Sequence, residues 1–163
     1  MGVLSGYRIL DLTDEKGVLC TRILSDMGAE VIRIEKPGTK NSRNDADYSY
    51  LNAGKRSICL ELEKKTGQEL FRHLVKKVDV LVESQAPGYL ASLGLGYNNL
   101  SEINPGLVMA AITPFGQDGP YQKYKSCDLV VEAMGGWLSV CGEPLAPLKL
   151  PGNQAYHTAS LFG

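Results

Sequence analysis

Basic side chains gather where the chain is expected to enter or leave its strands. Lys36 directly follows a β-branched run, and Arg43 lies in the polar stretch beyond it. Lys55 and Arg56 come just before a third alternating run, and Lys125 precedes a later helical pattern. Cations that converge at one edge of a sheet suit a ligand with several phosphate groups. The alternative is that each is an ordinary solvated surface charge, and the residues alone leave both interpretations open.

The turn after the first expected strand does not have the spelling of a nucleotide-binding loop. Residues 13–17 read TDEKG, which lacks the G-x-G-x-x-G spacing and presents two carboxylates to an incoming anion. The sequence also lacks a P-loop and the G-x-S-x-G turn of serine hydrolases. The usual nicotinamide, flavin and nucleophilic-serine sites are therefore not predicted.

Thiols and imidazoles are scattered along the chain. The cysteines form no Cys-x-x-Cys pair, which argues against a zinc site or a redox pair. His73 lies in a helical pattern and His157 lies beside a threonine near the end, and a structural role is favoured for both. We therefore predict no metal site, and reduced thiols in a cytoplasmic protein. The four cysteines are Cys20, Cys59, Cys127 and Cys141.

Composition limits the classes of partner. The chain has 163 residues, of which 44% are hydrophobic and 21% charged, enough for one ordinary core. A net charge of −1 provides no field that would attract nucleic acid. No apolar run reaches the roughly 20 residues that a bilayer-spanning helix needs. We therefore expect neither a nucleic-acid nor a membrane partner.

Strands and helices alternate along the sequence. Aliphatic runs predict strands, and apolar residues spaced three and four apart predict helices. The first two strands flank one helix, which makes a βαβ unit with parallel strands and a right-handed crossover. The predicted class is therefore α/β with a mainly parallel sheet. The expected strands are 7–12, 30–35, 57–62, 79–83 and 107–113, and the expected helices are 18–27, 66–77, two short ones within 89–104, 128–140, and one from about 153.

Polar or glycine- and proline-rich stretches should connect these elements. We expect loops over 38–50 and 114–126 and an extended connection around Pro144, Pro147 and Pro151. The sequence TGQE at 66–69 has the spacing of a capping box. The last expected helix has no cap or polar tail, which suggests that the 163 residues are part of a longer protein.

Several sequence motifs of this chain resemble those of one known family. Together they cover nearly the whole chain, and the sequence is identified as a member of the class III CoA-transferases. This family includes formyl-CoA transferase, carnitine CoA-transferase and α-methylacyl-CoA racemase. The stretches are LDLT at 10–13, LSDMGAEVIRIE at 24–35, NAGKRS at 52–57, DVLVE at 79–83, LGLGY at 93–97 and FGQDGPY at 115–121.

The resemblance implies a Rossmann-like large domain and an acyl-CoA substrate, with no metal. Family members are more than twice this long, because a small domain and a C-terminal return segment follow. Two such chains interlock as linked rings. Residues 1–163 would therefore be the N-terminal portion of the large domain, without the small domain and the return segment.

The same resemblance indicates where CoA would bind. The basic residue after the second strand, which contacts CoA phosphate in the family, is Lys36. The leucine near the adenine corresponds to Leu60, and a second basic position corresponds to Lys125. The family's Asn-Phe pair that touches CoA is replaced by Ser84 and Gln85. These departures lower the expected affinity for CoA.

The largest departure concerns the nucleophile. Family transferases use an aspartate, three residues before a threonine, to attack the acyl-CoA thioester and form a mixed anhydride. Ala155 occupies that place, and a methyl group cannot form an anhydride. The adjacent Gln154 is an amide and a poor nucleophile. The resemblance therefore assigns no catalytic residue to this chain.

Three functions follow from this pattern. The first is a non-catalytic subunit of a heteromeric CoA-transferase, paired with a homologous subunit that carries the aspartate, as in benzylsuccinate CoA-transferase-like systems. The second is an acyl-CoA transferase or racemase that is competent on its own, with Asp128 or Glu143 as the carboxylate. The third is a non-enzymatic acyl-CoA-binding module.

Overall fold

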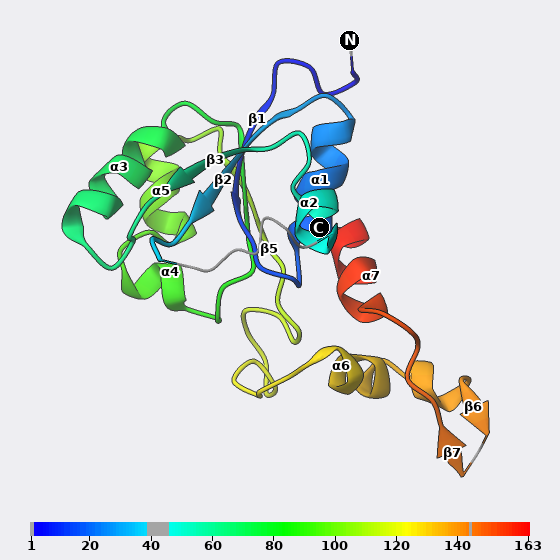
Figure 1. Cartoon of the computed structure of the whole chain (residues 1–163). Coiled ribbons are helices and arrows are strands. Elements are labelled where there is room, and N and C mark those ends of the chain that lie inside the picture. Colours follow the sequence, from blue (N-terminus) through cyan, green and yellow to red (C-terminus); the bar gives the residue numbers. More distant parts are fainter. Residues whose placement is uncertain (1, 39–45, 144) are drawn as a thin grey trace.

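A five-stranded parallel sheet forms the centre of the computed structural model, which describes residues 2–38, 46–143 and 145–163. The strand order is β3-β2-β1-β4-β5, so the chain builds outward from β1 first to one side and then to the other (Figure 1). The gap between β1 and β4 is the switch point at which such sheets bind ligands. The strands are β1 (Arg8–Leu12), β2 (Glu30–Glu35), β3 (Arg56–Cys59), β4 (Val80–Glu83) and β5 (Val108–Ala111).

Helices cover both faces of this sheet. On one face lie α3 (Lys65–Val75), α4 (Tyr89–Ser92) and α5 (Tyr97–Ile103), and on the other lie α1 (Val18–Asp26) and α7 (Gln154–Phe162) (Figure 1). This is the α/β architecture with a parallel sheet that the alternation of strands and helices predicted, and the Rossmann-like fold that the family resemblance implied.

A second, smaller part of the chain extends away from the sheet. It consists of α6 (Asp128–Met134), the short 3-10 helix η1 (Trp137–Ser139), and a hairpin of β6 (Gly142–Glu143) and β7 (Ala146–Pro147) (Figure 1). The chain then returns to the sheet as α7, whose Ser160 hydroxyl donates to the carbonyl of Lys16 at 3.2 Å.

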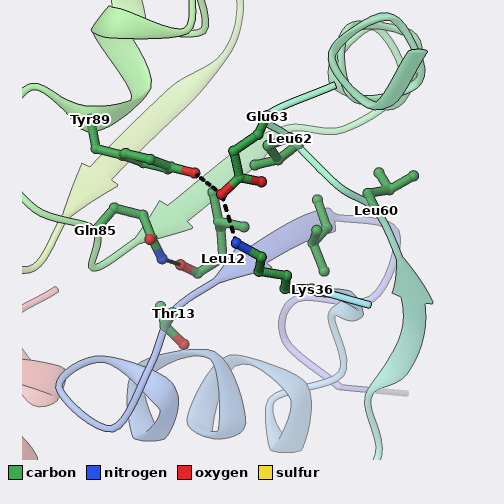
Figure 2. A pocket seen from close by; sticks show the side chains of 9 residues that line it. Leu12, Thr13, Lys36, Leu60, Leu62, Glu63, Gln85 and Tyr89 are labelled. Carbon is green, nitrogen blue, oxygen red and sulfur yellow. Dashed lines mark hydrogen bonds and ion pairs between the residues drawn. The ribbon is translucent and has the colours of Figure 1, made fainter. Parts of the chain in front are cut away.

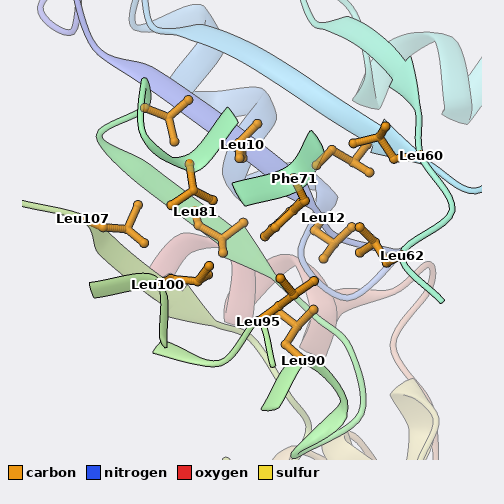
Figure 3. Packing of buried hydrophobic residues seen from close by; sticks show 13 residues of the cluster. Leu10, Leu12, Leu60, Leu62, Phe71, Leu81, Leu90, Leu95, Leu100 and Leu107 are labelled. Atoms are coloured by element: carbon orange, nitrogen blue, oxygen red, sulfur yellow. The ribbon is translucent and has the colours of Figure 1, made fainter. Parts of the chain in front are cut away.

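Alternate side chains of β1 supply two hydrophobic cores. Leu10 and Leu12 point into the larger core with Phe71 of α3 (Figure 3). Ile9 belongs to the smaller core on the other face. Because β1 is buried on both faces, apolar residues stand at 9, 10 and 12, interrupted by the buried Asp11, and this makes the strand recognisable in the sequence. Burying a leucine or phenylalanine of this kind contributes about 1.5–3 kcal/mol.

Most of the predicted elements are confirmed, with ends that shift by a few residues. The third strand is an exception, because β3 ends at Cys59 instead of residue 62. Leu60 and Leu62 do alternate, but both leave the sheet and insert into the larger core (Figure 3). Their burial in the core explains the alternation of apolar and polar residues, although both residues lie beyond the end of β3.

Two local predictions before and after β3 are wrong. Residues 46–50 were expected in a loop, but they belong to α2 (Ala46–Leu51), and the rest of that loop, 39–45, lies outside the described residues. The hydroxyl of Thr66 does not cap α3, because this helix begins at Lys65 and its N-cap is Lys64, without a side-chain cap bond. Gly67 instead lets α3 approach the preceding turn so closely that a Cβ at 67 would overlap the carbonyl oxygen of Glu61.

The helix expected over 128–140 is divided. Gly136 has φ +86°, a left-handed conformation that ends the helical run between α6 and η1. The connection expected around the prolines contains the β6–β7 hairpin, and its Pro144 lies outside the described residues. The start of α7 at Gln154 is confirmed within one residue.

Candidate functional site

A cavity of about 120 Å³ lies where β1, β2 and β4 end (Figure 2). The carboxyl ends of parallel strands meet there, so their first loop residues face one another. Ligand pockets that enclose a drug-sized molecule measure about 300–1,000 Å³, so this cavity would enclose one end of a larger ligand. Its lining consists of Leu12, Thr13, Ile34, Lys36, Leu60, Leu62, Glu63, Gln85 and Tyr89.

One end of the cavity carries an ion pair. The Nζ of Lys36 lies 2.8 Å from Oε1 of Glu63, and the hydroxyl of Tyr89 donates to the same oxygen at 3.1 Å (Figure 2). The hydrogen bond from Lys36 lowers the pKa of Glu63, and the same bond raises the pKa of Lys36. Burial, and then the bond to Glu63, raises the pKa of Tyr89. The carboxylate therefore stays ionised and paired near neutral pH.

The rest of the cavity combines apolar walls with one amide. The Nε2 of Gln85 donates to the carbonyl of Leu12 at 3.0 Å, and its backbone N–H donates to Glu83 Oε2 at 2.6 Å. Gln85 therefore joins the ends of β1 and β4 across the switch point. Apolar walls with a few convergent polar groups are typical of small-molecule sites.

The structure brings together three of the five residues expected to bind CoA. Lys36, Leu60 and Gln85 all line the cavity. Ser84 does not, because it is buried and exchanges hydrogen bonds with Asp14, each at 2.7 Å. Lys125 is exposed in the segment before α6 and lies outside the lining.

Lys55 is buried in a polar network within the fold and does not line the strand-end cavity. Its ammonium contacts Asp11 Oδ2 at 2.9 Å, Thr21 Oγ1 at 2.8 Å and the Val18 carbonyl at 3.0 Å. Burial lowers the pKa of Lys55 although Asp11 opposes the shift. Burial acts to raise the pKa of Asp11, but Lys55 and then Arg33 outweigh it and the pKa is lowered. This network joins β1 to α1 and to the segment before β3.

Two further cations expected at the strand ends do not add to the cavity. Arg56 pairs with Glu30 at 2.7 Å, at the start of β2 and thus at the opposite edge of the sheet. Arg43 lies outside the described residues. Lys36 is therefore the one described basic residue in the cavity lining.

Sequence reasoning missed Glu63 and Tyr89. Glu63 follows the alternating leucines, so the early end of β3 turns it toward the cavity. Tyr89 comes directly after the Pro87-Gly88 break, at the first position of α4. Tyr89 could have been found by its place directly after the turn that follows β4 at the switch point, whereas Glu63 lies four residues beyond the end of the edge strand β3 and carries no such signal.

The start of α7 forms a separate polar cluster. Ala155, only 8% exposed, and Tyr156 donate their backbone N–H groups to Asp128 Oδ1 at 3.0 and 3.2 Å. Lys149 Nζ lies 2.8 Å from Asp128 Oδ2. Burial acts to raise the pKa of Asp128, but the bonds from Lys149 and Tyr156 outweigh it and the pKa is lowered. The Asp128 carboxylate therefore caps the start of α7. Glu143, the other carboxylate considered as a nucleophile, is exposed on the β6–β7 hairpin.

The described part of the chain contains neither a metal-binding cluster nor a helix that could span a membrane. Within 2–38, 46–143 and 145–163, no three His, Cys, Asp or Glu side chains are grouped so that they could hold a metal ion. In the same part of the chain, no helix combines the length and apolar character that crossing a bilayer requires. All four cysteines are free thiols, and burial raises the pKa of Cys20.

A doubly wound sheet with a cavity at its switch point defines an α/β protein of the ligand-binding, Rossmann-like class. Within this class the comparison with family models is specific, because CoA-transferase family III matches residues 4–163. The chain belongs to CoA-transferase family III.

Individual relatives agree with this family. The chain is 38% identical to succinyl-CoA:(R)-benzylsuccinate CoA-transferase subunit BbsE of Thauera aromatica, over 97% of this chain and 42% of that protein. It is 38% identical to acetyl-CoA:oxalate CoA-transferase of Acetobacter aceti, over 90% of this chain and 40% of that protein. A CAIB/BAIF family protein from Brucella suis superposes with a TM-score of 0.91 at 33% identity, over 99% of this chain and 47% of that one. The chain thus spans less than half the length of these relatives.

Proposed function

We propose that this chain is part of an enzyme that transfers CoA between an acyl-CoA thioester and a carboxylic acid, and that it serves there as the non-catalytic subunit. Family membership supports the reaction class. A relative at 38% identity is named as one subunit of a CoA-transferase, which supports a heteromeric assembly. The proposed partner is a homologous subunit in the same compartment, which we take to be the cytoplasm.

The single observation that carries the non-catalytic role is the side chain at 155. Family chemistry needs a carboxylate that attacks the thioester carbonyl, releases CoA thiolate and leaves an acyl anhydride. Ala155 has no such group. Asp128 on α6 accepts two backbone N–H groups of α7 on Oδ1 and lies beside the ammonium of Lys149 through Oδ2, so this carboxylate is engaged in holding the start of α7.

The proposed CoA site is the strand-end cavity. Lys36, Leu60 and Gln85 supply a cation, an apolar wall and an amide at one place. Ser84 would act through Asp14 by holding the turn after β1. Lys125 is proposed as a cation for a part of CoA that extends beyond the cavity. No metal takes part in this proposal.

The test uses the protein in its natural full length, together with any chain that co-purifies. Transfer is assayed with formyl-, acetyl- and succinyl-CoA, which are donors named for relatives. We expect no transfer by this protein alone and transfer when the partner is present. A partner whose aspartate is replaced by alanine should abolish the reaction. Appreciable transfer by the protein alone contradicts the non-catalytic role.

The competing function is a transferase that acts without a partner. It predicts an acyl intermediate on Asp128 or Glu143 of this chain, which hydroxylamine or borohydride would trap for mass spectrometry. We expect the label on the partner only. The third function, an acyl-CoA-binding module without catalysis, predicts calorimetric binding of CoA but no transfer by any reconstituted complex.

A further inference from the structure

The ion pair at the rim of the strand-end cavity has an unusual composition for a phosphate site. Lys36 supplies the cation, but its ammonium lies 2.8 Å from the carboxylate of Glu63. Tyr89 holds the same carboxylate oxygen from the other side at 3.1 Å (Figure 2). Lys36 and Tyr89 therefore both orient the Glu63 carboxylate. A ligand that approaches the Lys36 ammonium also meets this carboxylate.

The charges of the cavity lining cancel. Among the described lining residues, Lys36 and Glu63 are the charged side chains, with one charge of each sign. A phosphate monoester that contacts Lys36 would lie within a few ångströms of the Glu63 carboxylate, because the two charged groups are in contact. Like charges at such a distance repel each other, and the repulsion grows as water is displaced.

A carboxylate after a strand of a doubly wound sheet has a recognised complementary ligand. In doubly wound sheets that bind dinucleotides, a carboxylate accepts a hydrogen bond from a ribose hydroxyl, whereas a nearby arginine accommodates a ribose phosphate; Glu63 has the same chemistry but lies beyond the edge strand β3. Glu63, with the Tyr89 hydroxyl beside it, offers an acceptor for a ribose hydroxyl. The adjacent Lys36 would offer a cation for a ribose phosphate.

We propose that Glu63 sets the ligand preference of this cavity, by disfavouring a phosphate monoester against Lys36 and favouring a hydroxyl-bearing group such as a free ribose diol. This rests on the proposed function, since it assumes that the cavity takes one end of a CoA-like ligand. The specific consequence is that dephospho-CoA, which lacks the 3′-phosphate, binds at least as tightly as CoA.

The experiment measures dissociation constants by calorimetry for CoA and dephospho-CoA with the protein in its natural full length. The variant is Glu63→Gln, which keeps shape and removes the charge. Its matched control is Glu61→Gln, which removes the same charge at a position two residues earlier. The Glu61 carboxylate pairs with Lys64 and not with Lys36. We expect E63Q to tighten CoA binding about tenfold and dephospho-CoA binding less than twofold, and E61Q to change neither by more than about twofold.

Two further arms show whether the gain acts through Lys36. In the double variant Lys36→Gln with Glu63→Gln the tenfold gain should disappear, because the described lining then holds no basic residue that could contact the phosphate. In E63Q the gain should shrink as the salt concentration rises, because Lys36 is solvent-exposed. Thermal unfolding of each variant checks that the fold is kept.

The outcomes separate the two proposals. If CoA and dephospho-CoA bind equally and E63Q leaves both unchanged, this inference is overturned and the proposed function stands. If CoA binds the unaltered protein more tightly than dephospho-CoA does, the inference is likewise overturned. If neither ligand binds any of the proteins, the inference and the proposed CoA site fail together.

Discussion

The pairs Lys55–Asp11 and Lys36–Glu63 have nearly the same nitrogen–oxygen distance, 2.9 and 2.8 Å, and opposite surroundings. The side chains of the first pair are 1% and 0% exposed, whereas those of the second are 63% and 44% exposed. A buried charge that loses its partner has no water to replace it, and an exposed one does. The first pair therefore holds the fold together, and only the second can exchange its partner for a ligand.

A third pair lies between these extremes. Asp128 and Lys149 have side chains that are 6% and 35% exposed, and their distance is 2.8 Å. One member is buried and also caps α7, so its loss should cost an intermediate amount. The three pairs thus form a series in which burial, not distance, sets the energetic role.

The largest expected effect comes from Lys55→Met. This change leaves the buried carboxylate of Asp11 with Arg33 as its remaining charged partner, so we expect a loss of about 3–5 kcal/mol in the free energy of unfolding. Urea unfolding followed by circular dichroism measures it. A loss below 1 kcal/mol would show that burial does not separate the two pairs.

The next effect is that of Asp128→Ala. It removes the acceptor for two N–H groups at the start of α7 together with the partner of Lys149, and we expect a loss of about 2 kcal/mol. Asp118→Ala, in an exposed turn, is the matched control and should cost less than about 0.5 kcal/mol. Equal losses in the two variants would contradict the capping role.

Acidification should lower the free energy of unfolding through the buried Lys55–Asp11 pair. Because the pKa of Asp11 is lowered from 3.8, its contribution is present above that value and is lost as pH falls through the lower folded pKa. We expect stability to fall below about pH 4, by at most about 1.4 kcal/mol per pH unit for this group. In Asp11→Asn this part of the pH dependence should vanish; an unchanged acid slope would assign it to other carboxyl groups.

The smallest expected effect is that of Lys36→Met on stability. Both members of the exposed pair remain solvated when separated, so the loss should be far smaller than that of Lys55→Met. The same urea titration measures it beside Lys55→Met. A loss as large as that of Lys55→Met would mean that the rim pair is structural and unsuited to ligand exchange.

The sequence could predict the sheet and its strand-end site because both depend on local patterns. The stretches 7–12 and 30–35 are rich in aliphatic residues and bounded by turn residues, which favours strands, and Lys36 follows the second of them directly. The place of Lys55 could not be predicted in the same way. Its partner Asp11 is 44 residues away in the chain, and the two meet through the packing of β1, α1 and the segment before β3.

The same limit applies to the start of α7 and to the cavity rim. The cap of α7 comes from Asp128, 27 residues before the N–H of Ala155, so no capping motif marks it in the sequence. Glu63 reaches Lys36 only because β3 ends early, and that end depends on core packing by Leu60 and Leu62. Contacts between distant segments are the part that spacing alone does not encode.

The tight approach of α3 to the turn at Glu61 has a consequence for evolution at the rim. Gly67 does not line the strand-end cavity, yet a single added methyl there would overlap the carbonyl oxygen of Glu61 and displace the turn that leads to Glu63. If Glu63 sets the ligand preference as proposed, a substitution at this glycine would alter that preference from outside the cavity.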